Sequence, residues 1–266
     1  MTANLNHESG QLLSGKHALV TGGSRGIGAA IVSLLLSHGA RVTSLGRGVS
    51  TTAAGEARSR GKAALRYVQA DVCDSASVGK AFGFARENFG EVEILVNSAG
   101  QASSAPFLKT DDKLWRQMMS VNLDGTFHCA QAALPGMLAA GWGRIINIAS
   151  TAALIGYAYV SAYAAAKHGV IGLTRSLALE VATKGVTVNA VCPGFTDTDM
   201  TKESVANIVA KTGRAAENAR AELASRNPQK RLVLPEEVAN AVAWLCLPGS
   251  EAITGQAITV AGGEVM

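Results

Sequence analysis

The amino-acid sequence predicts an α/β protein built on a doubly wound parallel sheet of about seven strands, with helices on both faces. Short apolar runs alternate with amphipathic stretches along the 266 residues, an order typical of parallel sheets covered by helices. Hydrophobic residues make up 48% of the chain, which is enough for a large core. No repeat, low-complexity block or linker divides the sequence. We therefore expect a flexible tail at residues 1–12 and a single domain at 13–266.

The apolar runs predict the strands of this sheet. The first run is HALVTG and the last is QAITVAG. Both are short, rich in β-branched residues and bounded by glycine, as expected of buried strands. In chain order, the predicted strands lie at 17–22, 40–46, 64–72, 92–100, 143–150, 185–194 and 256–262.

The stretches between these runs predict helices. Gly39 closes the first helix, and Gly55 interrupts the second, which is weak. The longest helix begins with a cap at Thr110 or Asp111, and Pro135 allows a bend in it. Residues 195–227 are rich in Lys, Arg, Glu and Ala and are predicted to form a flap over a site. The predicted helices lie at 26–39, 51–61, 75–90, 110–141, 161–180, 200–225 and 235–247.

Composition argues against several classes of function. The net charge is only +4 and the basic residues are scattered, so no nucleic-acid partner is expected. The N-terminus has no apolar signal region, and no apolar run is long enough to cross a membrane. The four cysteines lie far apart in the chain, and His128 and His168 have no ligand at metal-binding spacing. We expect no metal site, no membrane association, and reduced thiols in a cytoplasmic protein.

Tyr163 and Lys167 are four residues apart in a predicted helix, and Ser150 ends the strand before it. Residues at this spacing share one helix face, so a cation would lie beside a phenol whose ordinary pKa is near ~10. The cation would favour the phenolate and lower that pKa toward neutral pH, where acid–base catalysis is efficient. Taken alone, the spacing is more often that of a solvated pair without a catalytic role.

A glycine-rich turn, TGGSRGIG at residues 21–28, joins the first strand to the first helix. Glycines allow the chain to turn sharply and allow backbone amides to approach a pyrophosphate, which the positive end of the following helix also favours. Such a turn is weak evidence alone. Its position between a strand and a helix near the chain start is the context that a dinucleotide site requires.

Together these motifs resemble the short-chain dehydrogenase/reductase family, over almost the whole chain from about Gly15 to Gly263. The resemblance implies a Rossmann-like fold. Two positions depart from the family pattern: Ser98, where a second Asn is usual, and Ala261, where Asp is common. The motifs that carry the resemblance occur in the family's order: TGGSRGIG, Asp71-Val72, Asn97-Ser98-Ala99-Gly100, Asn122, Ser150, Tyr163 with Lys167, and Pro193-Gly194-Phe195-Thr196-Asp197-Thr198.

The resemblance implies a catalytic set of Asn122, Ser150, Tyr163 and Lys167. Tyr163 would exchange a proton with the substrate oxygen, Ser150 would hydrogen-bond that oxygen, and Lys167 would hold the nicotinamide ribose. Asn122 would position a water that links Lys167 to solvent, although it could instead be a helix-kink or capping residue.

The family also implies a cofactor site at the same end of the sheet. Asp71 would contact adenine, although it could be a plain strand-end turn residue, and Thr196 could be a plain loop hydroxyl. Besides Tyr163 and Lys167, the implied cofactor-binding residues are Gly22, Ser24, Arg25, Gly26, Ile27, Gly28, Gly46, Arg47, Asp71, Val72, Asn97, Ala99, Gly100, Pro193, Gly194, Thr196 and Thr198.

The choice of cofactor depends on the end of the second strand. A carboxylate there would bind the ribose 2′-OH of NAD(H) and repel the 2′-phosphate of NADP(H). The chain has Gly46 followed by Arg47, with Arg25 in the glycine turn. A guanidinium pairs well with phosphate. We therefore favour NADP(H) over NAD(H), although both arginines could be ordinary solvated loop residues.

Two regions of the sequence indicate the class of substrate. The regions around Tyr163 and Pro193 resemble 3-hydroxyacyl-CoA dehydrogenases, β-ketoacyl thioester reductases and polyketide ketoreductases, which implies an acyl-thioester substrate. Tyr157 and Tyr159 could equally be core or subunit-contact residues. A lipophilic, cyclic or steroid ketone remains an alternative, as does a noncatalytic dinucleotide-binding regulator. Relatives are mostly homotetramers, which the resemblance implies here. The candidate substrate-binding residues are Gln101, Ser150, Ala152, Leu154, Tyr157 and Phe195.

Overall fold

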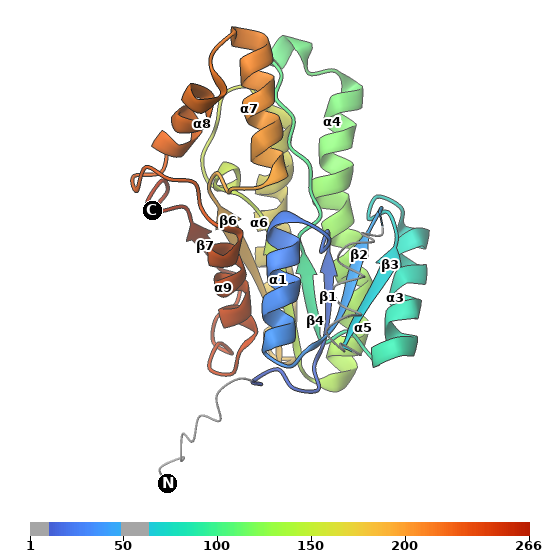
Figure 1. Cartoon of the computed structure of the whole chain (residues 1–266). Coiled ribbons are helices and arrows are strands. Elements are labelled where there is room, and N and C mark those ends of the chain that lie inside the picture. Colours follow the sequence, from blue (N-terminus) through green and yellow to red (C-terminus); the bar gives the residue numbers. More distant parts are fainter. Residues whose placement is uncertain (1–10, 49–63) are drawn as a thin grey trace.

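The computed structural model describes residues 11–48 and 64–266. Most of the expected tail at 1–12 and the whole weak helix expected at 51–61 lie outside the described residues. The described chain contains one sheet of seven strands, all parallel, in the order β3-β2-β1-β4-β5-β6-β7 (Figure 1). This confirms the predicted fold class. The strands are β1 (His17–Thr21), β2 (Arg41–Gly46), β3 (Leu65–Gln69), β4 (Ile94–Asn97), β5 (Gly143–Ile148), β6 (Val186–Pro193) and β7 (Ala257–Val260).

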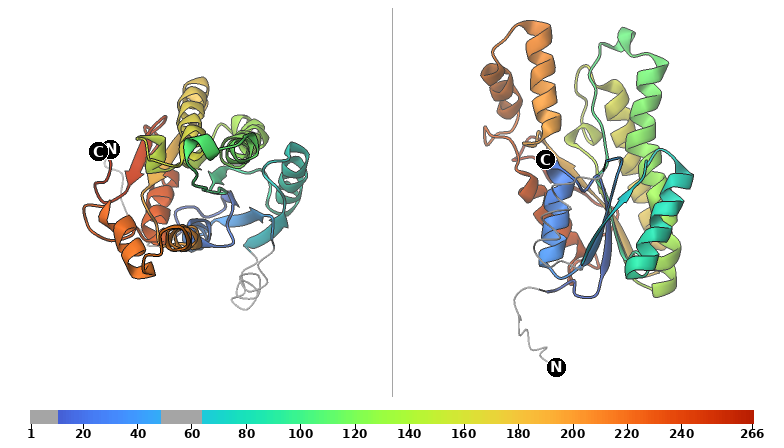
Figure 2. Two further views of the ribbon diagram at one scale, coloured as in Figure 1. Left: turned by 90° about the horizontal axis from the view of Figure 1, so that it is seen from above. Right: turned by 45° about the vertical axis from the view of Figure 1, so that its right-hand side comes forward.

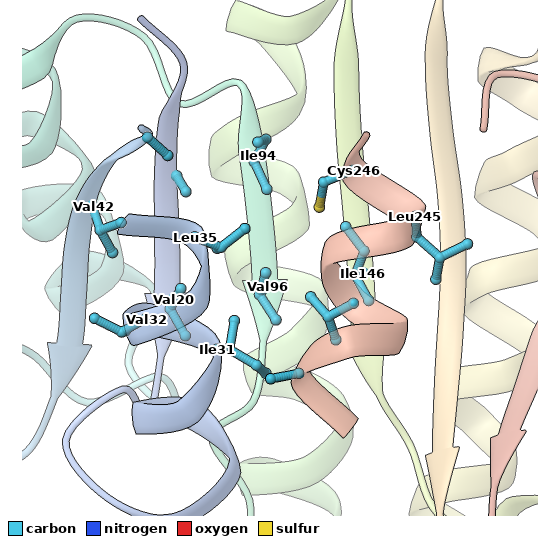
Figure 3. Packing of buried hydrophobic residues seen from close by; sticks show 14 of the residues in the cluster. Val20, Ile31, Val32, Leu35, Val42, Ile94, Val96, Ile146, Leu245 and Cys246 are labelled. Atoms are coloured by element: carbon cyan, nitrogen blue, oxygen red, sulfur yellow. The ribbon is translucent and has the colours of Figure 1, made fainter. Parts of the chain in front are cut away.

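The strands are buried because helices cover both faces of the sheet (Figure 2). Helices α1 (Gly26–Ser37) and α9 (Pro235–Cys246) pack together on one face. Their side chains form a continuous core with apolar residues of the strands, and Figure 3 shows Leu35 and Ile146 within it. On the other face lie α3 (Ser75–Phe89), α5 (Gly125–Ala140) and α6 (Ser161–Val181), which enclose a second core cluster. The near-continuous apolar runs of the strands are what a sheet buried on both faces requires.

The helical region expected at 110–141 contains a change of helical geometry that the sequence did not predict. Asp111 caps α4 (Asp112–Met119), with its side chain accepting from the amide of Leu114 at 2.8 Å. A π-helical turn, Ser120–Asp124, then joins α4 to α5. The α-helix continues through Pro135 without a break. The irregularity therefore lies at the turn that contains Asn122, and such π-bulges are frequent at functional sites.

The predicted flap, 195–227, consists mainly of two helices, α7 (Asp199–Thr212) and α8 (Ala216–Ser225). The sequence predicted one helical stretch here. Gly213 divides it, because its φ of +69° is a left-handed conformation that ends α7. Both helices stand beyond the carboxyl ends of the strands, on the side where α4 also projects (Figure 1).

The sheet order places the candidate residues at one edge. Strands β2 and β3 lie on one side of β1, and strands β4 to β7 lie on the other, so the order in which strands are added reverses at the β1–β4 boundary. Open α/β sheets bind ligands outside the carboxyl ends of the strands at such a switch point. Thr21, at the end of β1, pairs in register with Asn97, at the end of β4, and Asn97 pairs with Asn147 of β5. Several strands in the structure are shorter than the sequence predicted, because the last residues of the predicted strands form turns at this edge.

Candidate active site

The glycine turn between β1 and α1 leaves no room for side chains at two positions. Gly22 has a φ of +68°, and a Cβ built on it would lie 3.0 Å from Cα of Ala99. A Cβ on Gly28 would overlap the carbonyl oxygen of Gly22. The turn thus packs against the loop after β4 and presents bare backbone at the N-terminus of α1. This is the shape that a pyrophosphate needs.

The loop after β4 is held in place by buried polar groups. The hydroxyl of Thr21 accepts from the amides of Ser98 and Ala99, each at 3.0 Å. Asn97 donates to Oδ1 of Asn147 at 2.9 Å and is only 4% exposed. Its own Oδ1 is buried without a hydrogen-bond partner in the described part of the protein. An unpaired buried acceptor is costly, so this atom fits a site where a ligand completes the hydrogen bonding.

Two arginines, each close to a carboxylate, lie near the residues implied for the adenosine end of the cofactor. Gly46 ends β2, and the exposed Arg47 follows it. Asp71 accepts from the amide of Cys73 at 2.9 Å, which lowers the pKa of its carboxyl, and Arg47 adds a smaller contribution in the same direction. Arg25 lies 3.9 Å from Asp199 at the start of α7. No carboxylate occupies the strand-end position at Gly46, so the residues present fit a 2′-phosphate better than a free 2′-hydroxyl.

Lys167 lies close to Tyr163, the candidate proton donor. Its side chain is 5% exposed, Nζ donates to the carbonyl of Ile148 at 2.8 Å, and Nζ lies 5.8 Å from the centre of the Tyr163 ring. Burial lowers the pKa of Lys167 to about 8, from 10.5. The structure thus places the phenol and the ammonium on one face of α6, next to the end of β5, as the spacing predicted.

The pKa of Tyr163 differs from the sequence expectation. Burial raises it above the ordinary value of 10, and the hydrogen bond with Ser150 only partly opposes this effect. The expectation that Lys167 lowers the phenol pKa is therefore wrong. Desolvation penalises the phenolate more strongly than the surrounding groups favour it. The consequence is a phenol that stays protonated at neutral pH.

Asn122 connects the π-helical turn to the loop after β4. It is fully buried, and Nδ2 donates to the carbonyls of Gln101 and Met118, both at 2.9 Å. A Cβ built on Gly100 would lie 2.9 Å from Oδ1 of Asn122 and 3.6 Å from Nζ of Lys167. The glycine therefore keeps open the space between Asn122 and Lys167.

The loop after β6 closes the crevice from the side of the flap. The amide of Gly194 donates to Val260 of β7, and the hydroxyl of Thr196 donates to Gly194 at 3.0 Å. A Cβ built on Gly26 would lie 3.2 Å from the methyl group of Thr198. This loop thus reaches the glycine turn at the carboxyl edge of the sheet.

Three further candidates for cofactor or substrate binding make hydrogen bonds within the protein. The carbonyl of Val72 accepts from His128 at 3.0 Å, which accounts for one of the two histidines. Gln101 accepts from Gln117, and the amide of Ala152 donates to Oγ of Ser150 at 3.1 Å. Within residues 11–48 and 64–266, no cluster of His, Cys, Asp or Glu could hold a metal, and no helix is long and apolar enough to cross a membrane.

One residue beside the site was absent from the sequence expectations. The phenol of Tyr157 donates to Oε1 of Glu264 at 2.7 Å. Glu264 is the third residue from the end of the sequence and belongs to no motif. Only the folded chain brings it to the loop that follows Ser150.

Comparisons with known proteins agree with this geometry. The model of the family described as short chain dehydrogenase matches residues 16–208. The D-beta-hydroxybutyrate dehydrogenase of Cupriavidus necator is 37% identical, covering 96% of this chain and 99% of the relative. A 3-oxoacyl-[acyl-carrier-protein] reductase of Vibrio cholerae is 40% identical, covering 96% and 99%. A crystal structure of a variant actinorhodin polyketide ketoreductase with NADPH has a TM-score of 0.90 at 37% identity, covering 96% of this chain and 98% of that one.

These findings confirm the resemblance to the short-chain dehydrogenase/reductase family that the motifs indicated. The chain belongs to the short-chain dehydrogenase family.

Proposed function

We propose that the protein is an NADP(H)-dependent oxidoreductase that interconverts a 3-oxoacyl thioester and its 3-hydroxyacyl form. The observation that carries this proposal is the approach of Ser150 and Lys167 to Tyr163, with Gly100 of the loop after β4 next to Lys167. A protein that only binds a dinucleotide needs no phenol paired with a buried ammonium. The relatives named as a 3-oxoacyl reductase and a polyketide ketoreductase support the thioester class.

The residues of the crevice fit an extended dinucleotide. The bare backbone at residues 22–28 would hold the pyrophosphate, Asp71 the adenine, and Arg47 with Arg25 the 2′-phosphate. Lys167 would hold the nicotinamide ribose, with the space beside Gly100 left free for it. When bound, the nicotinamide supplies or accepts the hydride.

Tyr163 would donate a proton to the carbonyl oxygen as the substrate is reduced. Its raised pKa keeps the proton in place until negative charge develops on that oxygen. Ser150 would hydrogen-bond the same oxygen and stabilise the developing charge. Asn122 would position the water through which Lys167 exchanges protons with solvent.

The cofactor preference can be reversed at two residues. We expect Gly46→Asp combined with Arg47→Leu to shift the preference from NADPH toward NADH by at least about tenfold, because a carboxylate accepts from the 2′-OH and repels a 2′-phosphate. The ratio of kcat/KM for the two coenzymes measures this shift. Arg41→Leu, at the other end of β2, is the matched control. An unchanged ratio in the double variant would contradict the assignment of Arg47.

The region at 195–227 would act as a flap over the acyl group. In α7 only Thr201 is buried, and Lys211 near its end contacts the carbonyl of Ser104 across the crevice at 3.4 Å. A helix with so few buried residues is typical of segments that open at low cost, whereas α8 also buries Ala219 and Leu223. The pocket beneath the flap would be formed by Gln101, Ala152, Leu154, Tyr157 and Phe195.

A substrate panel tests the proposed function. Acyl thioesters, cyclic ketones and a steroid ketone would each be offered with NADPH and with NADH, and oxidation of the coenzyme followed by its near-ultraviolet absorbance. We expect the highest kcat/KM with a 3-oxoacyl thioester and NADPH. A higher value with a cyclic or steroid ketone, or no turnover of any substrate, would refute the proposal.

The exposed apolar side chains near α4, α5 and α6 support a homotetramer. Leu108 is 97% exposed and Leu179 is 81% exposed, and Phe107, Trp115 and Phe127 are also open to solvent. In a tetramer, other copies of the chain would cover such exposed apolar side chains. The four cysteines are free thiols, which supports a location in the cytoplasm.

A further inference from the structure

The carboxylate of Glu264 lies beside Tyr157, one of the residues proposed to bind the substrate. Its Oε1 accepts from the Tyr157 phenol at 2.7 Å, and a Cβ built on Gly194 would lie 2.8 Å from its Oε2. Gly194 follows β6, in the loop implied to flank the nicotinamide. Glu264 is thus placed between the loop after β5 and the loop after β6, and it is partly buried there.

Tyr157 connects Glu264 to the catalytic residues. The Tyr157 hydroxyl lies 2.9 Å from Oγ1 of Thr151, and Thr151 directly follows Ser150. Burial raises the pKa of Tyr157 to about 12, and the nearby Glu264 carboxylate acts in the same direction. Tyr157 therefore remains a hydrogen-bond donor that fixes the position of the Glu264 carboxylate.

The charge of Glu264 is only partly compensated. Within residues 11–48 and 64–266, Oε2 has no hydrogen-bond partner and the carboxylate makes no ion pair. Arg226 lies 5.3 Å from the centre of the Tyr157 ring, but it is exposed and screened by water. A second anion bound in this pocket would therefore meet an unneutralised negative charge.

We propose that Glu264 selects the substrate by charge: its carboxylate excludes free 3-oxo and 3-hydroxy acids and so commits the site to neutral acyl thioesters. The inference rests on the proposed function. In a 3-oxo acid the carboxylate is separated from the reacting carbonyl by a single carbon. Once Ser150 and Tyr163 hold that carbonyl, the carboxylate must lie within the same pocket. A thioester carries no charge at this position, so it escapes the repulsion.

The experiment compares acetoacetate with the acetoacetyl thioester of N-acetylcysteamine, which is uncharged, using NADPH. The substitution Glu264→Gln keeps the size of the side chain and its ability to accept from Tyr157. We expect it to raise kcat/KM for acetoacetate about tenfold, the effect of removing one nearby charge, with the thioester value almost unchanged. Glu264→Asp should retain the wild-type ratio. Glu180→Gln, an exposed change on α6, is the charge-matched control.

Salt dependence gives a second measurement on the unaltered protein. Raising the ionic strength should improve acetoacetate relative to the thioester in the wild type, because salt screens the repulsion, and this dependence should be lost in Glu264→Gln. An unchanged substrate ratio in Glu264→Gln, in a wild type that reduces the thioester, would overturn the role of Glu264 alone. A wild type that reduces no thioester would overturn the proposed function, and this inference with it.

Discussion

Replacing Tyr163 by Phe should lower kcat for carbonyl reduction by about a thousandfold while leaving the affinity for NADPH almost unchanged. The phenol is the only candidate proton donor that Ser150 and Lys167 both approach in the described site. Positioned acid–base groups contribute about 10²–10⁴-fold to rate. Phe keeps the ring and its packing, so the loss should appear in kcat. Initial rates and fluorescence titration with NADPH measure the two quantities.

Tyr159→Phe is the matched control for this variant. Tyr159 lies four residues before Tyr163 and is 66% exposed. The control therefore removes a phenol hydroxyl that does not belong to the catalytic set. We expect this control to retain its activity. Substantial turnover in Tyr163→Phe would show that another group delivers the proton, and weaker NADPH binding without loss of kcat would make Tyr163 a cofactor-binding residue only.

The sequence predicted the fold because the relevant signals are local. Alternating apolar and amphipathic stretches identify strands and helices by their periodicity, and parallel strands bring all their carboxyl ends to one edge. The sequence therefore assigns motifs as distant as the glycine turn and Ser150 to one site. Gly39 follows the end of a helix and Asp111 caps the start of another, as predicted. Helix ends and helix caps depend only on residues that are close in the sequence.

The features that the sequence did not predict depend on distances in the folded chain. The π-helical turn around Asn122 is a shift in hydrogen-bond register that apolar periodicity does not record. The contact between Tyr157 and Glu264 joins residues 107 positions apart. The direction of the Tyr163 pKa shift depends on how far burial outweighs neighbouring charges, and residue spacing shows only that a cation is near.

The buried ammonium of Lys167 should control the pH dependence of the enzyme. Its pKa of about 8 lies well below that of an ordinary lysine, whereas the pKa of Tyr163 is raised above 10. The value of kcat/KM for NADPH reports groups that titrate in the free enzyme. It should be level at neutral pH and fall about tenfold per pH unit above about 8, as Lys167 loses its proton. Rates measured at low NADPH from about pH 6 to pH 10 test this.

The same pKa shift predicts that Lys167 lowers stability. Between about pH 8 and 10.5 the folded chain releases a proton that the unfolded chain keeps, so the free energy of unfolding should rise with pH across this window. Below pH 8 the folded protein bears the full cost of burying the charge. Lys167→Met should therefore be inactive, yet more stable at neutral pH by on the order of 1–3 kcal/mol.

Chemical denaturation of both proteins at neutral pH measures this difference, with Lys184→Met, an exposed change beyond α6, as the control. A stabilised but inactive Lys167→Met would separate catalysis from folding, because a residue that merely supports the fold cannot raise stability when it is removed. A destabilised variant, or a wild-type pH profile that stays level to pH 10, would mean that the ammonium is better solvated than its burial indicates.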